Sequence, residues 1–259
     1  MKKILMFTVI GLSLALGISS SAFAFSIPQP AAEVAASKLA QIQIRAQQGD
    51  SDAQYLLGLM YLSGRFVAMD ATVGVQWMLA AAEQGHAKAQ QTVADLSFEG
   101  QLIKRDLSRA EHWYLVQSEQ GNRWAHFRLG FIYAAGGDGV SRHCGKAVDQ
   151  FSAVGDQVSL GNVAWILATC PEAEFRNGNK AVALSLKLLE GDENSPTNLD
   201  NLAAAYAESG DFSAAIVTQQ KAIEALARSA ETAKVDEFQQ RLQFYQQKRA
   251  YREVLPLLD

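Results

Sequence analysis

Small and apolar residues recur at a fixed interval along the first half of the chain. Three stretches align without gaps, each beginning three residues after a glycine: residues 52–64, 88–100 and 124–136. The glycines that precede them, Gly49, Gly85 and Gly121, are 36 positions apart. Within each stretch apolar or small residues recur three and four positions apart, which places them on one face of a helix. The pattern predicts three copies of a helix.

The segments between these helices repeat as well. Residues 73–85 align with residues 109–121, so that Trp77 corresponds to Trp113. A tiny residue such as Gly58 allows a second helix to approach closely, and a glycine such as Gly64 ends a helix at least cost. Each unit is therefore predicted to be a helical hairpin. Because one hairpin cannot bury its own apolar face, neighbouring copies are expected to stack.

The repeated motif resembles a known family. The pattern AQYLLGLMYLSG…D…W…AAEQGHAKAQ in the first copy is similar to Sel-one-like repeats, which are relatives of the tetratricopeptide repeats. From about residue 159 the spacing falls to 34, as between Ala181 and Ala215, and residues 199–223 resemble a tetratricopeptide unit. An insertion is expected around Pro171. The resemblance implies an all-α fold, an α-solenoid of stacked antiparallel helical hairpins.

These patterns divide the chain into five segments. We expect a signal peptide (1–24), an N-terminal linker and capping helix (25–48), Sel-one-like repeats (49–158), tetratricopeptide-like repeats (159–230), and a C-terminal capping helix and tail (231–259). Residues 237–253 are predicted to form the closing helix.

The first residues have the layout of a secretory signal peptide. A short basic start precedes an apolar run and small residues that favour cleavage after Ala24. An uncleaved membrane anchor is the alternative, but the apolar run is shorter than the roughly 20 residues that a spanning helix needs. We therefore expect a periplasmic protein with no membrane span after signal removal.

Charge and motifs argue against nucleic-acid binding and catalysis. The formal net charge is -4, whereas nucleic-acid binding rests on clustered Lys and Arg. The sequence holds no G-x-S-x-G, H-E-x-x-H, C-x-x-C or S-x-x-K motif. The four histidines are too scattered for a shared metal, and His86 is expected to cap a helix. We predict no catalytic residue, no cofactor and no metal.

The two cysteines have a sharper interpretation. Cys144 stands at the start of a helix predicted over residues 145–154, and Cys170 stands at the end of one predicted over residues 159–170. Since these helices are expected to be antiparallel neighbours, a disulfide is geometrically reasonable in an oxidising compartment. Two buried free thiols are the alternative.

The resemblance also implies a binding surface. In solenoids of this class the first helix of each hairpin lines a concave face. The inward positions are then Asp52, Tyr55, Leu59, Lys88, Gln91, Asp95, Trp124, Phe127 and Phe131. We predict that Tyr55, Leu59, Trp124, Phe127 and Phe131 contact a protein or peptide partner in the bacterial envelope. Trp124 replaces polar residues of the other copies, so it either anchors the partner or packs against a neighbouring loop.

The function implied by the resemblance is that of an exported, non-catalytic adaptor or scaffold, which binds a peptide or partner domain in its concave groove. One alternative is a structural subunit of an envelope complex. Another is a penicillin-binding or β-lactamase-like Sel-one-like repeat protein. Those relatives carry a cysteine pair in nearly every repeat, whereas the first two copies here contain no cysteine.

Overall fold

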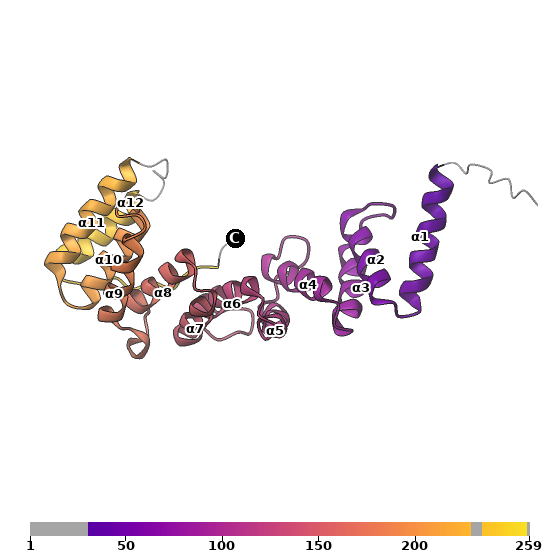
Figure 1. The fold of residues 1–259 in the computed structure, drawn as a ribbon, viewed down its shortest axis with the longest axis horizontal. Coiled ribbons are helices and arrows are strands. Elements are labelled where there is room, and N and C mark those ends of the chain that lie inside the picture. Colours follow the sequence, from indigo (N-terminus) through magenta and orange to yellow (C-terminus); the bar gives the residue numbers. More distant parts are fainter. Residues whose placement is uncertain (1–30, 229–234, 258–259) are drawn as a thin grey trace, which may run out of the picture.

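The computed structural model describes residues 31–228 and 235–257, which form an elongated stack of helices (Figure 1). The helices are α1 (Ala31–Gln47), α2 (Ser51–Ser63), α3 (Ala71–Glu83), α4 (Ala87–Glu99), α5 (Leu107–Ser118), α6 (Arg123–Ala135), α7 (Cys144–Val154), α8 (Gln157–Thr169), α9 (Gly178–Leu189), α10 (Pro196–Glu208), α11 (Phe212–Ala227) and α12 (Val235–Gln246). From α1 to α8 the helices follow one another along the long axis in chain order, and α9 to α12 gather at the end opposite α1 (Figure 1). A short 3₁₀ helix, η1 (Ala173–Phe175), lies in the insertion expected around Pro171.

The predicted all-α solenoid is confirmed for the residues that the structure describes. Each helix packs against the next along the chain, and α8 also packs directly against α10. An isolated β-bridge between Gly137 and Val140 closes the loop before α7. The predicted signal peptide (1–24) lies outside the described residues. Within residues 31–228 and 235–257, none of the helices is both long enough and apolar enough to cross a bilayer.

Polar side chains define where the helices start. Every helix from α2 to α11 begins with a residue whose side chain accepts a hydrogen bond from a backbone N–H of the first turn. Such a cap satisfies one of the amides that have no partner within the helix. His86 Nδ1 accepts from Ala89 N at 3.1 Å, which confirms its expected capping role.

Small residues allow the paired helices to approach closely. A Cβ atom on Gly58 of α2 would lie 2.9 Å from Met78 Cγ and 3.0 Å from the carbonyl oxygen of Gly74, both in α3. The equivalent Gly130 of α6 faces Phe151 of α7, and a Cβ atom there would lie 2.7 Å from two ring carbons. A side chain at either glycine would force these neighbours to move. The column of tiny residues is thus a packing requirement of the hairpin.

The C-terminal end differs from the sequence prediction. The closing helix was expected over residues 237–253, but α12 ends at Gln246. Lys248 adopts a left-handed conformation (φ 55°), and Arg249 N donates to Phe244 O at 2.9 Å, which closes the helix. The described chain then runs back toward the middle of the stack (Figure 1). The helical prediction for residues 247–253 was wrong because these residues find better contacts with α8, described below.

An ion pair is buried where α10, α11 and α12 meet. Asp200 Oδ1 accepts hydrogen bonds from Gln219 Nε2 at 2.7 Å and from Arg241 Nε at 3.2 Å. All three side chains are buried. Burial raises the pKa of Asp200 from its ordinary 3.8 to about 6, although the Arg241 charge and the Gln219 hydrogen bond oppose the rise. The folded protein therefore holds a proton that the unfolded chain releases between about pH 4 and pH 6.

This difference predicts a pH-dependent effect of Asp200→Asn. Between about pH 4 and pH 6 the native state binds more protons than the unfolded state, so the contribution of Asp200 to stability falls as the pH rises. Between pH 4.5 and pH 7 the wild type is expected to lose about 2 kcal/mol relative to the Asn variant, which does not titrate. Urea unfolding of both proteins at pH 4.5 and pH 7 measures this. If the free energies of unfolding of the two proteins differ by the same amount at both pH values, the raised pKa of Asp200 is contradicted.

Candidate partner-binding face

The inward positions predicted from the repeats lie along α2, α4 and α6, and side chains link one repeat to the next. The Tyr55 ring stacks on the His86 imidazole, with centroids 4.6 Å apart. His86 Nε2 also lies 3.3 Å from Asp52 Oδ1. Between the next two repeats, the Trp124 indole N–H donates to Asp95 Oδ1 at 3.1 Å. We use the term repeat face for Asp52, Tyr55, Leu56, Leu59, Gln91, Asp95, Trp124, Phe127 and Arg128.

A groove opens at the N-terminal end of the repeat face. It encloses about 480 Å³ and is lined by Asp52, Tyr55, Leu56, His86, Ala87 and Lys88. Leu56 and Leu59 keep a large part of their side chains exposed at this end of the face. The groove therefore combines an aromatic surface and aliphatic side chains with charges of both signs.

Asp95 is the centre of a hydrogen-bond network in the middle of the face. Its carboxylate accepts from Tyr114 Oη at 2.6 Å, from Trp124 Nε1 at 3.1 Å and from Gln91 Nε2 at 2.9 and 3.0 Å. Burial, and then the nearby Asp95 charge, raise the pKa of Tyr114. The Tyr114 hydroxyl therefore stays protonated and donates to Asp95, which in turn holds the indole in place.

Trp124 is both packed and exposed. Its ring stacks on Phe127 with centroids 5.7 Å apart, and the Arg128 guanidinium lies 4.3 Å from the ring centroid. The residue is still 42% exposed. These contacts join Trp124 to residues of helices α4 and α6. Because the indole N–H is already bonded to Asp95, a partner would contact the ring surface.

The other predicted contact residues separate into two groups. Tyr55, Leu59 and Phe127 are partly exposed, as the prediction requires. Phe131 is only 5% exposed and packs edge-to-face against Phe127 and Phe151, each 5.1 Å away. Its inclusion was wrong, because the Phe151 ring of α7 packs against it and the side chain is left buried.

Sequence reasoning missed two residues of the face. Leu56 lies beside Tyr55 in α2, one turn before Met60, and its side chain is exposed. Neither Leu56 nor its equivalents in the other repeats were singled out from the sequence. Arg128 lies between two aromatic rings, 4.4 Å from the Phe98 centroid and 4.3 Å from that of Trp124. The spacing of Arg128 four residues after Trp124 is the signal that would have placed the two side chains together.

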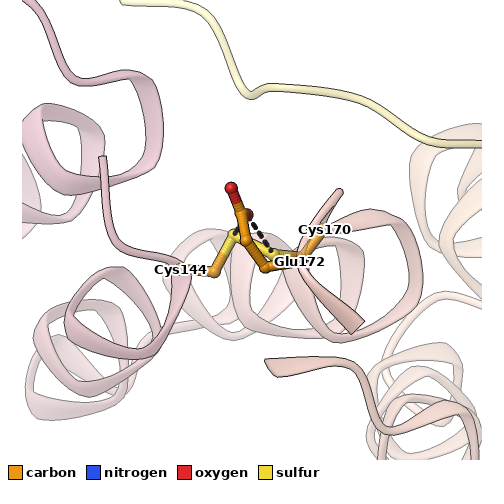
Figure 2. A group of neighbouring side chains, drawn as sticks. All are labelled: Cys144, Cys170 and Glu172. Carbon is orange, nitrogen blue, oxygen red and sulfur yellow. Dashed lines mark hydrogen bonds between the residues drawn. A yellow bond between two sulfur atoms is a disulfide. The ribbon is translucent and has the colours of Figure 1, made fainter. Parts of the chain in front are cut away.

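Cys144 and Cys170 are joined by a disulfide that connects the start of α7 to the end of α8 (Figure 2). Their Cα atoms are 6.5 Å apart, and 26 positions separate them in the sequence. The Glu172 carboxylate lies beside the bond, 3.1 Å from Cys170 Sγ and 3.5 Å from Cys144 Sγ. A disulfide sulfur carries no proton, so these contacts would become hydrogen bonds only with reduced thiols. Glu172 is instead paired with Arg142.

In the described part of the chain, one group of potential metal ligands comes together. It consists of Cys144, Cys170 and Glu172, whose sulfur and carboxylate oxygen atoms lie within 4.8 Å of one another. With the sulfur atoms bonded to each other, neither cysteine offers the thiolate that a metal would bind. Arg142 further places a positive charge on the carboxylate. The arrangement therefore acts as a covalent link next to an ion pair.

Comparison with known families agrees with the helical hairpins. The family model for the Sel1 repeat matches residues 51–86, 87–122 and 125–149. The chain contains three Sel1 repeats. The first two matches correspond to the hairpins α2–α3 and α4–α5, and the third covers α6 and the first half of α7. The repeat face is thus formed by the first helix of each Sel1 repeat.

The chain is similar to several solved structures. A Sel1 repeat protein from Oxalobacter formigenes has a TM-score of 0.50 and 19% identity, over 81% of this chain and 94% of that one. A protective antigen present in uropathogenic Escherichia coli strains, displaying an SLR fold, has a TM-score of 0.48 and 24% identity over 83% of this chain. This chain spans 45% of that protein.

A third structure is the TPR2AB domain of yeast Sti1 in a complex with pHSP90. It has a TM-score of 0.37 and 15% identity, over 83% of this chain and 99% of that one. No curated protein matches the chain. The structure with the TM-score of 0.50 supports the fold alone, which is a stack of helical hairpins.

Proposed function

We propose that this protein is an exported, non-catalytic adaptor that holds an extended segment of a partner protein along its repeat face. Solenoids of this kind present extended binding surfaces. The observation that carries the proposal is the repeat face itself. Tyr55, Leu56 and Leu59 on the first repeat and Trp124 and Phe127 on the third keep exposed apolar surface, and the polar Gln91 and Asp95 of the second repeat lie between them.

The geometry of the face suits binding. Aromatic side chains dominate the energetics of most interfaces, because they bury a large area with few rotatable bonds. Asp95 and Arg128 already hold Trp124 in position, so little conformational entropy would be lost when a partner binds. The 480 Å³ groove beside Tyr55 has room for a side chain of the partner.

Two features support export. The first 24 residues have the layout of a signal peptide, and the Cys144–Cys170 disulfide is of the kind that persists in an oxidising compartment. Cell fractionation, with the mass of the mature chain, tests this part of the proposal. A chain that is found in the cytosol with its first 24 residues intact would refute it.

Leu59→Asp is expected to weaken partner binding at least tenfold, because a charge would be placed in an apolar contact. Leu115→Asp is the matched control, since Leu115 lies on α5 and both leucines are 37% exposed. Binding is measured with the partner captured by a photo-crosslinking residue at position 59.

The same crosslinking residue at position 115 gives the control for capture. We expect adducts from position 59 and none of the same mass from position 115. Equal adducts from both positions, or equal loss of binding by the two Asp variants, would show that the repeat face is not the binding surface.

A further inference from the structure

The last residues of the described chain form an extended segment that lies against the helices. We call residues 249–257 the tail. Tyr251, Glu253, Leu255 and Leu257 are partly buried, whereas Arg252, Val254 and Pro256 between them are exposed. This alternation is typical of an extended strand with one side on a surface. Tyr251, Leu255 and Leu257 pack against the main hydrophobic core.

The tail is bound at the C-terminal end of α8. Glu253 N donates to the Thr169 carbonyl oxygen at 3.0 Å, and Arg252 Nη1 lies 3.3 Å from that of Ala168. These carbonyls belong to the last turn of α8, where backbone acceptors lack partners within the helix. The Trp165 indole N–H donates to Glu253 Oε2 at 2.9 Å. Both the backbone and the acidic side chain of the tail are therefore recognised.

Aromatic side chains form the second contact. The Tyr251 ring lies 6.1 Å from the ring of Trp165 and 5.5 Å from that of Phe244. The guanidinium of Arg241 is 5.5 Å from the Tyr251 centroid. At the rim, Arg252 pairs with Glu208 of α10. The contacts thus select an aromatic residue followed two positions later by an acidic one.

The groove beneath the tail is larger than the tail needs. It encloses about 790 Å³ between α8, α10, α12 and the tail itself. Asn162 of α8 lines it, and the Nδ2 atom of this residue is buried without a hydrogen-bond partner. Such a donor is costly unless a ligand or water accepts from it. Open space and an unused donor both indicate a site that can hold more chain than residues 249–257 supply.

We propose that the tail is an internal ligand of a peptide-binding groove formed by α8, α10 and α12. The external ligand is an extended segment of another protein. Like Tyr251, Glu253 and Leu255 of the tail, it has an aromatic residue, then an acidic residue two positions later, then an aliphatic residue two positions after that. This inference rests on the proposed function, in that the protein binds extended partner segments. Among the described residues, one hydrogen bond between backbone atoms joins residues 250–257 to the helices. Its donor is Glu253 N and its acceptor is Thr169 O. A longer segment that repeats the contacts of the tail and also fills the open part of the groove would displace it.

A labelled peptide with the sequence of residues 249–257, RAYREVLPL, tests the proposal on the full-length chain. In the wild type the tethered tail competes at high effective concentration, which weakens apparent peptide binding. The variant Tyr251→Ala/Glu253→Ala removes the two anchoring side chains from the tail. We expect this variant to bind the peptide at least tenfold more tightly than the wild type, measured by fluorescence anisotropy.

Val254→Ala is the matched control, because Val254 belongs to the tail but is exposed. It is expected to bind the peptide as the wild type does, and a peptide with the Glu253→Gln change is expected to bind the double variant more weakly. Equal affinity of all three proteins for the peptide would overturn the proposal. So would a dimer by light scattering that the peptide dissociates, because the groove would then hold the tail of a second copy.

Circular dichroism checks that the double variant keeps its helices. If it does not, the wild type is titrated with excess peptide, and hydrogen exchange of the Glu253 amide is expected to accelerate as the tail leaves. Unchanged exchange at saturating peptide would also overturn the proposal. These experiments need no natural partner. If the peptide experiments fail, the proposal that a partner binds the repeat face is unaffected. If crosslinking from position 59 fails, the proposal for the tail groove is unaffected.

Discussion

Arg241→Leu is expected to lower the free energy of unfolding by about 3–5 kcal/mol at pH 7. Asp200 is 4% exposed, and its carboxylate lies 3.2 Å from Arg241 Nε. Removal of the guanidinium leaves that carboxylate in the core without its counter-charge. Urea unfolding followed by circular dichroism measures the loss.

Two controls separate this effect from simple loss of packing. The variant Asp200→Asn/Arg241→Leu should recover part of the stability, because no charge is then buried alone. Arg109→Leu removes an exposed arginine that pairs with Asp106 at 2.9 Å, and it is expected to cost less than about 1 kcal/mol. An Arg241→Leu variant within about 1 kcal/mol of the wild type would show that the buried pair contributes little.

Cys144→Ser/Cys170→Ser is expected to cost about 3.5 kcal/mol, the chain entropy of a loop closed over the observed separation of 26 positions. The link joins α7 to α8, where the Sel1 repeats meet the following helices, so these two helices should lose protection from hydrogen exchange first. Chemical unfolding of the variant and of the oxidised wild type measures the difference.

The thiol state provides the control for this second prediction. The native protein should show no alkylatable thiol, and two after reduction under denaturing conditions. The reduced wild type should then match the double Ser variant in stability. Two accessible thiols in the native protein, or equal stability of the oxidised and reduced forms, would contradict the prediction.

Most of the fold could be predicted from the sequence because its determinants are local. A tiny residue at Gly58 or Gly130 is required wherever two helices cross closely, and a capping side chain such as His86 marks a helix start. Both signals recur at the repeat interval, so each copy supports the interpretation of the others. The helices predicted at 145–154 and 159–170 differ from α7 and α8 by two residues or fewer at each end.

The candidate site was less predictable, because exposure depends on neighbours that are distant in the sequence. Repeat register places Phe131 with Phe127, yet Phe131 is covered by Phe151 of α7. The sequence marks Trp124 as unusual for its repeat position, but the hydrogen bond from its indole to Asp95 joins residues that are 29 positions apart. No local pattern reports such a pair.

The sequence by itself determined the repeating hairpins, their stacking and the positions of the caps, since these follow from interactions within one repeat and its neighbour. Only the tertiary structure decided the course of residues 247–257. Their composition is compatible with a helix end, but the free carbonyls of α8 and the indole of Trp165 are contacts that the tail meets only once the stack has formed. These contacts lie more than 80 positions away along the chain. The helix pattern in a sequence depends on residues within a few positions of one another. It therefore does not reflect the free energy gained from contacts with residues that are distant in the sequence.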